Sequence, residues 1–194
     1  KKIDQPLFPD YWERLLKSLD FFAKKKQRTC VRLTLVKKEN MCDLEGYADL
    51  IHRGDPDFIE IKGYMFVGAS QQRLSYDNMP LHEEIVIFSK ELVQLLPEYD
   101  IVSEHIPSRV VMLSKKTFKK VDGWYTWIDF LKFHELVLLG KEFTSEDYLR
   151  KTPLVGISGK GTAEHNAMLQ EQRRKKKDGM YVNENTDELE FWKE

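Results

Sequence analysis

Two side chains of opposite charge stand two residues apart at the end of an apolar stretch. Phe58, Ile59 and Ile61 indicate a buried strand, and Glu60 and Lys62 alternate with them. Because successive side chains of a strand alternate between its two faces, the carboxylate and the ammonium point to the same side. Such a pair either holds the polar groups of a ligand or forms a salt bridge in solvent, which contributes only about 0–1 kcal/mol.

A second strand with polar groups on one face precedes this one. The segment Thr29–Lys37 alternates valine and leucine on one face with Arg32 and Thr34 on the other, and Asn40 follows its end. Ligands of parallel α/β folds bind at the carboxyl ends of the strands. If the shared face is enclosed, its charges must be paired or bound to a ligand, because a buried unpaired charge costs several kcal/mol. The predicted pocket comprises Arg32, Thr34, Lys37, Asn40, Glu60, Lys62 and Tyr64.

Helical periodicity places three helices around these two strands. The pattern predicts a helix capped by Asp10, a second from about Asp43 to Gly54, and a third from about His82 to Leu96. This alternating order with short connections implies parallel strands joined by right-handed crossovers. Two strands alone make neither a covered sheet nor a barrel, and the sequence does not start with Met. We therefore expect further strands upstream, in a longer protein.

The second half of the chain changes character. From about Gly159 onward, Gly, Lys, Asn and Glu dominate, which is typical of a mobile tail. The sequence thus divides into residues 1–97, 98–158 and 159–194. The middle part is predicted to hold strands at 100–105 and 108–114, a turn at Asp122-Gly123, a helix over 127–140 and a short helix from Thr144 or Ser145.

Composition excludes several classes of protein. The chain has 194 residues, is 41% hydrophobic and carries a net charge of -1, which argues against wholesale nucleic-acid coating. No apolar run approaches the roughly 20 residues of a membrane span, and no signal-peptide pattern is present, so we expect a cytoplasmic protein without a membrane partner. Cys30 and Cys42 provide neither a disulfide framework nor a four-ligand zinc site, so no metal site is predicted within the chain.

Several motifs, in a fixed order, resemble those of one family. KKIDQPLF, RLTLVK, DFIEIKGYMFVGAS, NMPLHEE and SEH are similar to segments of the radical-SAM tRNA 4-demethylwyosine synthases of the wybutosine pathway. The similarity covers roughly residues 1 to 155. The region after Val121, with WYTWIDF and KTP, resembles the C-terminal wyosine-base-formation region of that family, whereas the ending LVGISGKGTAEHN departs from it.

The resemblance implies a fold and an activity. The fold would be the C-terminal portion of a radical-SAM partial TIM-type barrel, an α/β structure, followed by a small α+β region. Members of the family convert N1-methylguanosine beside the anticodon of phenylalanine tRNA into 4-demethylwyosine, using pyruvate and S-adenosylmethionine. A [4Fe-4S] cluster held by Cys-x-x-x-Cys-x-x-Cys cleaves the S-adenosylmethionine, and eukaryotic members tend to carry an upstream flavodoxin-like electron-donor domain that would bind FMN.

The resemblance also gives roles to the predicted site residues. The pocket residues would hold S-adenosylmethionine, pyruvate or the target base. Lys62 is one candidate for a lysine that forms a Schiff base with pyruvate, although the family's usual lysine lies upstream. Core packing is the alternative for Trp124 and Trp127. By charge and stacking, the residues expected to face tRNA are Arg73, His105, Arg109, Trp124 and Trp127.

One departure from the family is decisive for this chain. It lacks Cys-x-x-x-Cys-x-x-Cys, and its two cysteines are too few for a cluster that needs three or four thiolates. The chain alone is therefore predicted to be catalytically inert, with no catalytic residue assigned within it. Two other readings stay open, a non-catalytic RNA-binding remnant and an interaction module that uses the basic run 173–177 and the acidic end of the chain.

Overall fold

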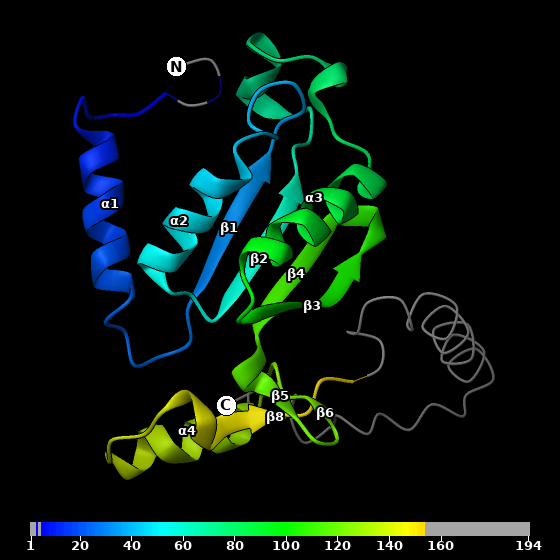
Figure 1. Ribbon diagram of the computed structural model, residues 1–194. Helices are drawn as coiled ribbons and strands as arrows, with labels where there is room; N and C mark the ends of the chain where they lie inside the picture. The colour runs from blue at the N-terminus through cyan, green and yellow to red at the C-terminus, as the bar shows by residue number, and fades with distance from the viewer. Residues whose placement is uncertain (1–2, 4, 154–194) are drawn as a thin grey trace, which may run out of the picture.

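A four-stranded mixed sheet forms the centre of the computed structural model, which describes residues 3 and 5–153 (Figure 1). The strands are β1 (Cys30–Leu35), β2 (Phe58–Gly63), β3 (Tyr99–His105) and β4 (Val110–Lys115), in the spatial order β1-β2-β4-β3. β1 and β2 are parallel, and β4 is antiparallel to both of its neighbours. The predicted parallel crossover between the first two strands is confirmed, and the predicted strands after Pro97 extend the same sheet.

Three helices follow the predicted order around this sheet. They are α1 (Tyr11–Phe22), α2 (Leu44–Gly54) and α3 (His82–Leu95). The Asp43 carboxylate caps α2 by accepting a hydrogen bond from the backbone N–H of Gly46 at 3.1 Å. The cap predicted at Asp10 is wrong, because its carboxylate accepts from the Arg14 Nε at 2.9 Å instead of from the first turn of α1.

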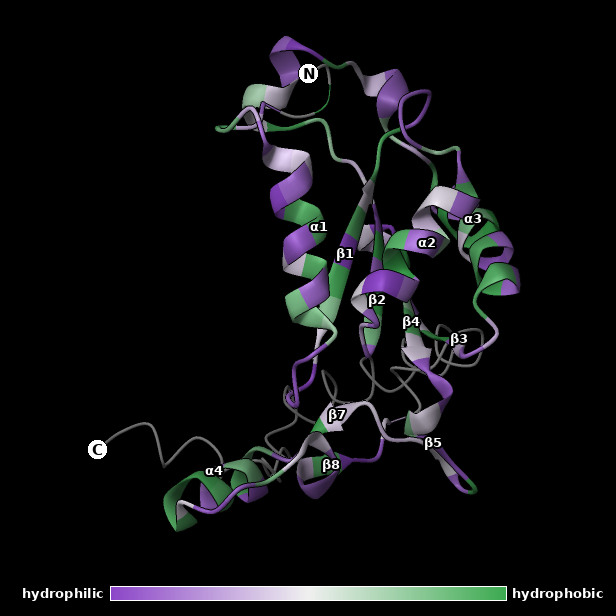
Figure 2. Ribbon diagram, turned by 60° about the vertical axis from the view of Figure 1, so that its left-hand side comes forward, coloured by the Kyte–Doolittle hydropathy of each residue, from purple (hydrophilic) through white to green (hydrophobic). Residues whose placement is uncertain are grey.

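α2 and α3 cover one face of the sheet. The hydrophobic core lies between these helices and that face. Ile59, Ile61 and Leu113 of the strands pack against Ile85 and Leu92 of α3, and all five are fully buried. α1 packs on α2 beside β1, and Figure 2 shows hydrophobic and hydrophilic bands alternating along it. The opposite face of the sheet carries the polar side chains that the sequence placed there.

Short 3-10 turns connect the strand ends. η1 (Gly68–Gln72) and η2 (Tyr76–Asn78) lie between β2 and α3, and η3 (Ile106–Ser108) joins β3 to β4. All three lie at the end of the sheet where the parallel strands finish (Figure 1). The connection from β2 to α3 is the long one at this end, which is the end where ligands bind in α/β folds.

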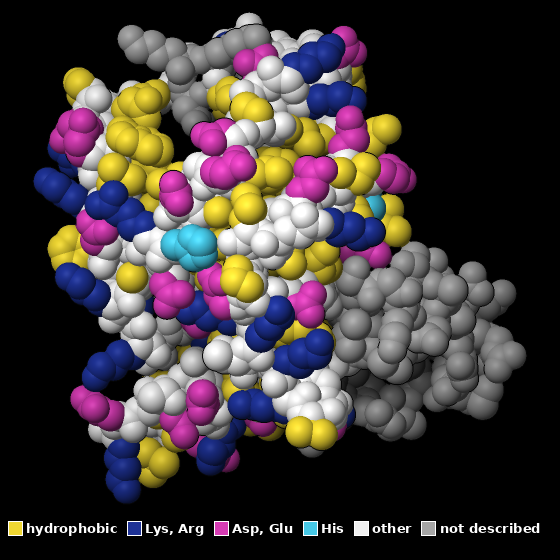
Figure 3. All heavy atoms as spheres, viewed as in Figure 1, with side chains coloured by type: hydrophobic (Ala, Val, Ile, Leu, Met, Phe, Trp, Pro, Cys, Tyr) yellow, Lys and Arg dark blue, Asp and Glu magenta, His cyan; other side chains and the backbone are white. Residues whose placement is uncertain are grey.

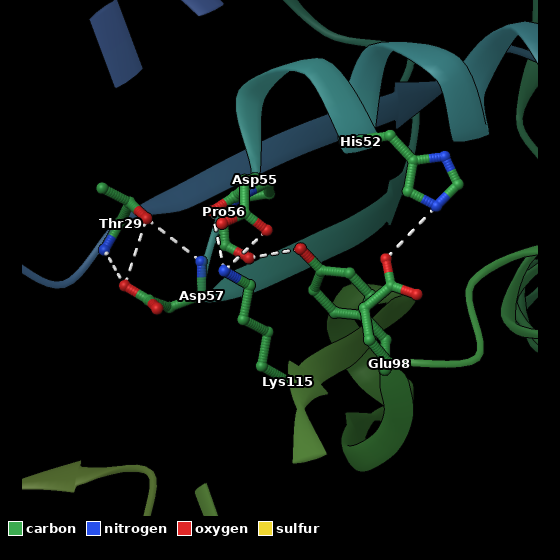
Figure 4. A network of polar contacts seen from close by, with 8 residues as sticks. Thr29, His52, Asp55, Pro56, Asp57, Glu98 and Lys115 are labelled. Carbon is green, nitrogen blue, oxygen red and sulfur yellow. Dashed lines mark hydrogen bonds and ion pairs between the residues drawn. The ribbon is translucent and has the colours of Figure 1, made fainter. Parts of the chain in front are cut away.

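A network of polar contacts fixes the opposite end of the sheet, where β1 and β2 begin (Figure 4). Thr29 and Asp57 bond reciprocally: the Thr29 N–H donates to the Asp57 Oδ2 at 2.8 Å, and the Asp57 N–H donates to the Thr29 Oγ1 at 3.0 Å. His52 Nε2 lies 3.3 Å from the Glu98 Oε1 and links α2 to the turn before β3. These contacts set the point at which the two parallel strands start.

Tyr99 forms the buried centre of this network. Its hydroxyl donates to the Pro56 carbonyl oxygen at 2.5 Å, and its side chain is fully buried. Burial raises the pKa of the Tyr99 hydroxyl far above its ordinary value, with smaller contributions from Asp55 and Glu98. The Lys115 ammonium closes the same corner with an ion pair of 2.7 Å to Asp55.

A small α+β region follows the sheet and begins at Lys116 instead of the predicted residue 98. It consists of η4 (Lys116–Phe118), β5 (Lys119–Lys120), β6 (Gly123–Trp124), β7 (Trp127–Ile128), α4 (Phe130–Leu139), η5 (Ser145–Tyr148) and β8 (Leu149–Arg150). The helix predicted over 127–140 begins later, because Trp127 and Ile128 pair with β8 and Asp129 caps the helix through the Lys132 N–H. It ends as predicted at Gly140, whose φ of 62° is left-handed.

The boundary expected after Pro97 falls inside one sheet. β3 and β4 follow it in sequence yet pair with β2 and share its core. The tail predicted for 159–194, with its basic run, lies outside the described residues. None of the described helices is long and apolar enough to cross a membrane.

We expect the substitution Tyr99→Phe to destabilise the protein by about 1–3 kcal/mol, because it leaves the buried Pro56 carbonyl without its donor. The folded-state pKa of Tyr99 is raised above the unfolded value of about 10. The stabilisation from a neutral Tyr99 is therefore present below about pH 10 and lost as the pH rises above it. Urea unfolding of the longest available form of the protein at pH 8 and pH 10.5 measures both effects.

The variant should lose less stability between the two pH values than the wild type. Tyr76→Phe is the matched control, because Tyr76 is 68% exposed. Equal pH dependence in wild type and Tyr99→Phe would contradict the assignment.

Candidate functional site

The sheet register explains why Glu60 and Lys62 share a face. In the parallel pair β1–β2, Arg32 lies opposite Glu60, and Thr34 lies opposite Lys62. The Arg32 Nε donates to the Glu60 Oε2 at 2.7 Å, with side chains 59% and 18% exposed. This hydrogen bond raises the pKa of the Arg32 guanidinium. The structure thus brings four predicted pocket residues together on the face that the helices leave open.

The side chains of Lys37 and Asn40, at the end of β1, both have polar partners. The Lys37 Nζ lies 2.6 Å from the Glu84 Oε1, and this contact is the main reason that the pKa of the Glu84 carboxyl is lowered. The Asn40 amide donates to the Thr34 carbonyl at 3.0 Å and accepts from the Val36 N–H at 2.6 Å. Asn40 therefore shapes the turn after β1, whereas Lys37 links the end of β1 to the first turn of α3.

Tyr64 lies in a groove along the free edge of β1. Its ring is buried, and its hydroxyl hydrogen-bonds to the Ser70 Oγ at 2.8 Å. The groove has a volume of about 740 Å³ and lies between α1, α2 and β1. Its lining is mostly apolar, with polar groups from Arg32, Thr34, Asn40, Tyr64 and Ser70. An apolar groove with a few convergent polar groups is the usual form of a small-molecule site.

Lys62 and Thr34 differ from the other pocket residues. Among the described residues, neither the Lys62 Nζ nor the Thr34 Oγ1 has a hydrogen-bond or ion-pair partner. Lys62 is half-buried on the central strand β2, and the nearest acid on its strand, Glu60, is engaged by Arg32. Two donors are thus available side by side on the open face.

The residues predicted to face tRNA separate into two groups. Arg73 follows η1, and Arg109 precedes β4, so both lie where the parallel strands end, together with the exposed His105. Trp124 and Trp127 belong to the small region at the opposite end of the sheet (Figure 1). The structure therefore does not place the five residues on one continuous surface.

The two arginines are held close to the backbone. Arg109 has a left-handed φ of 51°, and its side chain packs so tightly over Gly63 that a Cβ added there would lie 3.2 Å from the Arg109 Cβ. One guanidinium nitrogen of Arg109 and the Nε of Arg73 are buried without a partner among the described residues. Arg73 donates to the Ile3 carbonyl at 3.5 Å.

The two tryptophans have different surroundings. Trp124 is 7% exposed and packs in a second core cluster with Phe58, Val102 and Phe118, while the Lys119 ammonium lies 5.3 Å from its ring centroid. The base-stacking role predicted for Trp124 is thus inconsistent with its burial, and the alternative of core packing holds. Trp127 is 45% exposed.

Sequence reasoning missed Asn78, which orders the connection to α3. Asn78 is buried, donates to the Lys37 carbonyl at 2.9 Å and accepts from the Ser75 N–H at 2.9 Å. The spacing of Ser75 and Asn78 is that of a capping box and could have indicated it.

Sequence reasoning also missed Arg28, because its contacts are with residues far away in the sequence and no local motif marks it. Its guanidinium lies 4.8 Å from the Phe58 ring centroid and 5.4 Å from that of Phe118, and donates to the Thr126 carbonyl. Burial lowers its pKa. Arg28 therefore joins the start of β1 to the small C-terminal region, beside a lower pocket of about 490 Å³.

The chain does not fit an iron–sulfur cluster. Cys30 starts β1, whereas Cys42 precedes α2 at the other end of that strand. A six-residue strand spans about 20 Å, so the two thiols cannot ligate one cluster. The described residues also contain no group of three or more His, Cys, Asp or Glu that could hold a metal ion.

The helix-covered side of the described part of the molecule has no separate positive and negative patches. Figure 3 shows Lys and Arg interspersed with Asp and Glu over the face that carries the helices. The site is instead the polar face of an α/β sheet at the ends of its parallel strands. The fold and site define this chain as an α/β unit with one helix-covered sheet face and one face that carries polar side chains.

Comparison with known proteins identifies the family. The family described as wyosine base formation matches residues 53–115. This match crosses the expected boundary at residue 97 and ends before Val121, so it does not include the segment after Val121 to which the resemblance assigned this region. The S-adenosyl-L-methionine-dependent tRNA 4-demethylwyosine synthases TYW1 of Mus musculus and Homo sapiens are 47% and 45% identical over 167 and 171 residues. The Arabidopsis thaliana synthase is 46% identical over 162 residues. A solved structure, "Structure of TYW1 with a lysine-pyruvate adduct bound", is 35% identical, with a TM-score of 0.50.

The chain belongs to the tRNA 4-demethylwyosine synthase family. The matches to the mouse and human synthases cover 82% and 83% of this chain, but only 23% of each relative, and the Arabidopsis match covers 82% and 25%. The solved structure covers 57% of this chain, which spans 34% of that one. The chain thus spans about a quarter of the length of the curated relatives that it matches.

The two tryptophans provide a stability test of this geometry. We expect Trp124→Ala to cost about 3–5 kcal/mol, because it opens a cavity between Phe58 and Phe118. Trp127→Ala should cost clearly less, about 1 kcal/mol, because nearly half of Trp127 is exposed. Chemical denaturation of both variants measures the difference, and equal costs would contradict the distinction.

Proposed function

We propose that this chain forms part of the pocket of a tRNA-modifying enzyme that converts N1-methylguanosine next to the anticodon of phenylalanine tRNA into 4-demethylwyosine. The co-substrates would be pyruvate and S-adenosylmethionine. The observation that carries the proposal is the open sheet face, on which Arg32, Glu60, Thr34 and Lys62 align across a parallel strand pair. Sequence identity of 45–47% to mammalian synthases supports it.

The fold supports a role as one part of a radical-SAM partial barrel. Two parallel strands have one face covered by helices, and β1 has a free edge beside the groove of about 740 Å³. Further parallel strands of the full-length protein would pair with this edge and enclose the polar face. A bound [4Fe-4S] cluster would supply the reductive cleavage of S-adenosylmethionine, and its thiolates would come from outside this chain.

The residues of this chain would bind and orient the ligands. The Arg32–Glu60 pair fixes the middle of the face, and Thr34 and Lys62 present free donors beside it. The apolar lining of the groove would exclude water around the reacting groups. Electrons would come from a flavodoxin-like FMN domain of the full-length protein or from a separate donor protein.

Iron uptake by the chain and by a longer gene product tests the proposal. We expect only the longer product to take up iron during anaerobic reconstitution, read by its visible absorbance. It should then convert N1-methylguanosine in phenylalanine tRNA, read by mass spectrometry of the nucleosides. The chain of 194 residues should do neither, because it has two cysteines. If the longer product takes up no iron, the radical mechanism is wrong, and the polar face would be an RNA-binding surface without catalysis.

Trp127 tests the RNA contact separately. Its exposed ring would stack on an unpaired base, so Trp127→Ala should weaken tRNA binding by the roughly 1–3 kcal/mol typical of one stacked base. Trp127→Phe retains an aromatic ring and should retain most of the affinity. Filter binding of tRNA to the full-length protein measures this, and unchanged affinity in Trp127→Ala would remove Trp127 from the interface.

A further inference from the structure

Thr34 and Lys62 are the two pocket residues whose side-chain donors the fold leaves unused. The Arg32 guanidinium binds Glu60, the Lys37 ammonium binds Glu84, the Asn40 amide binds backbone, and the Tyr64 hydroxyl binds Ser70. Of the predicted pocket residues, only Lys62 and Thr34 have side-chain donors without a partner in the part of the chain that the structure describes.

The strand register places these two donors next to each other. Thr34 and Lys62 are direct partners across β1 and β2, so their Cα atoms lie about 4.8 Å apart and their side chains leave the same face. An ammonium and a hydroxyl that leave the same face of neighbouring strands can donate to the two oxygens of one carboxylate.

The surroundings of Lys62 favour an anion of small size. β2 lies between β1 and β4, and Val110 is the partner of Lys62 on the β4 side. Lys62 is half-buried there, so its ammonium is partly desolvated and gains from a counter-ion. The neighbouring acid Glu60 already accepts from Arg32 at 2.7 Å. A half-buried cation on the central strand is accessible from one face of the sheet only, which favours a single small anion.

We propose that Lys62 and Thr34 together bind the carboxylate of a small-molecule co-substrate. The inference rests on the proposed function, in which both pyruvate and S-adenosylmethionine carry a carboxylate. Lys62 supplies the charge and Thr34 supplies the second donor, while the Arg32–Glu60 pair keeps Glu60 from neutralising Lys62.

The experiment measures binding to the full-length protein that contains this chain. Equilibrium dialysis with radiolabelled pyruvate and, separately, with radiolabelled S-adenosylmethionine gives two dissociation constants. Filter binding of phenylalanine tRNA gives a third. The variants are Lys62→Met, Lys62→Arg and Thr34→Val. Lys90→Met is the matched control, because Lys90 is an exposed lysine on α3.

We expect Lys62→Met to weaken one of the two co-substrates at least tenfold, and Thr34→Val to weaken the same one by roughly three- to tenfold, in line with loss of a charged and a neutral hydrogen bond. Lys62→Arg should retain part of the affinity. Lys90→Met and the tRNA affinity should be unchanged. A loss confined to pyruvate assigns the site to the pyruvate carboxylate, and a loss confined to S-adenosylmethionine assigns it to the methionyl carboxylate.

Two outcomes would overturn the inference. One is unchanged affinity for both co-substrates in Lys62→Met and Thr34→Val, and the other is a loss of tRNA affinity alone. If Lys62→Met fails to fold, Thr34→Val and Lys62→Arg decide the question. The wild-type protein separates this result from a failure of the proposed function. If the wild type binds both co-substrates and forms product, and the variants bind equally well, only the carboxylate site is contradicted.

Discussion

The parallel pairing of β1 with β2 is the constraint on which the rest of the structure depends. Its register sets Arg32 against Glu60 and Thr34 against Lys62, and the same register sends Ile59 and Ile61 into the helix-covered core. A slip by one residue would turn every one of these side chains to the wrong face. Core packing on one side therefore guarantees the polar arrangement on the other.

Both ends of this strand pair are fixed by polar contacts, but with different consequences. Where the strands begin, Thr29, Asp57 and Tyr99 satisfy backbone groups in a buried network, and Arg28 stacks on aromatic rings to attach the small C-terminal region. This end has a structural role. Where the strands finish, Asn40 and Asn78 satisfy the turn backbones and hold the connections in place, so a ligand can use the remaining donors without disturbing the fold.

Under the proposed function, the chemical groups of the chain would bind ligands, and the cluster thiolates would come from other parts of a longer protein. The chain contributes cations, a carboxylate, hydroxyls and an apolar groove, which are groups that bind and orient. It does not contribute the thiolates of a cluster, because its two cysteines lie at opposite ends of β1. The contacts at both strand ends hold the polar face in place, as a preorganised binding site requires.

The sequence by itself determined the helix and strand order through β4, the parallel crossover and the shared face of Glu60 and Lys62, because these follow from local periodicity and from the two-residue repeat of a strand. The family also followed from the order of its motifs.

Tertiary structure decided the rest. It inserted β4 antiparallel beside β2, so that the expected boundary at Pro97 lies within one sheet, and it delayed α4 to Phe130 through a pairing with distant β8. It buried Trp124, engaged Lys37 with Glu84 and left Lys62 unpaired. These outcomes depend on contacts between residues far apart in the chain, whose partners no local pattern specifies.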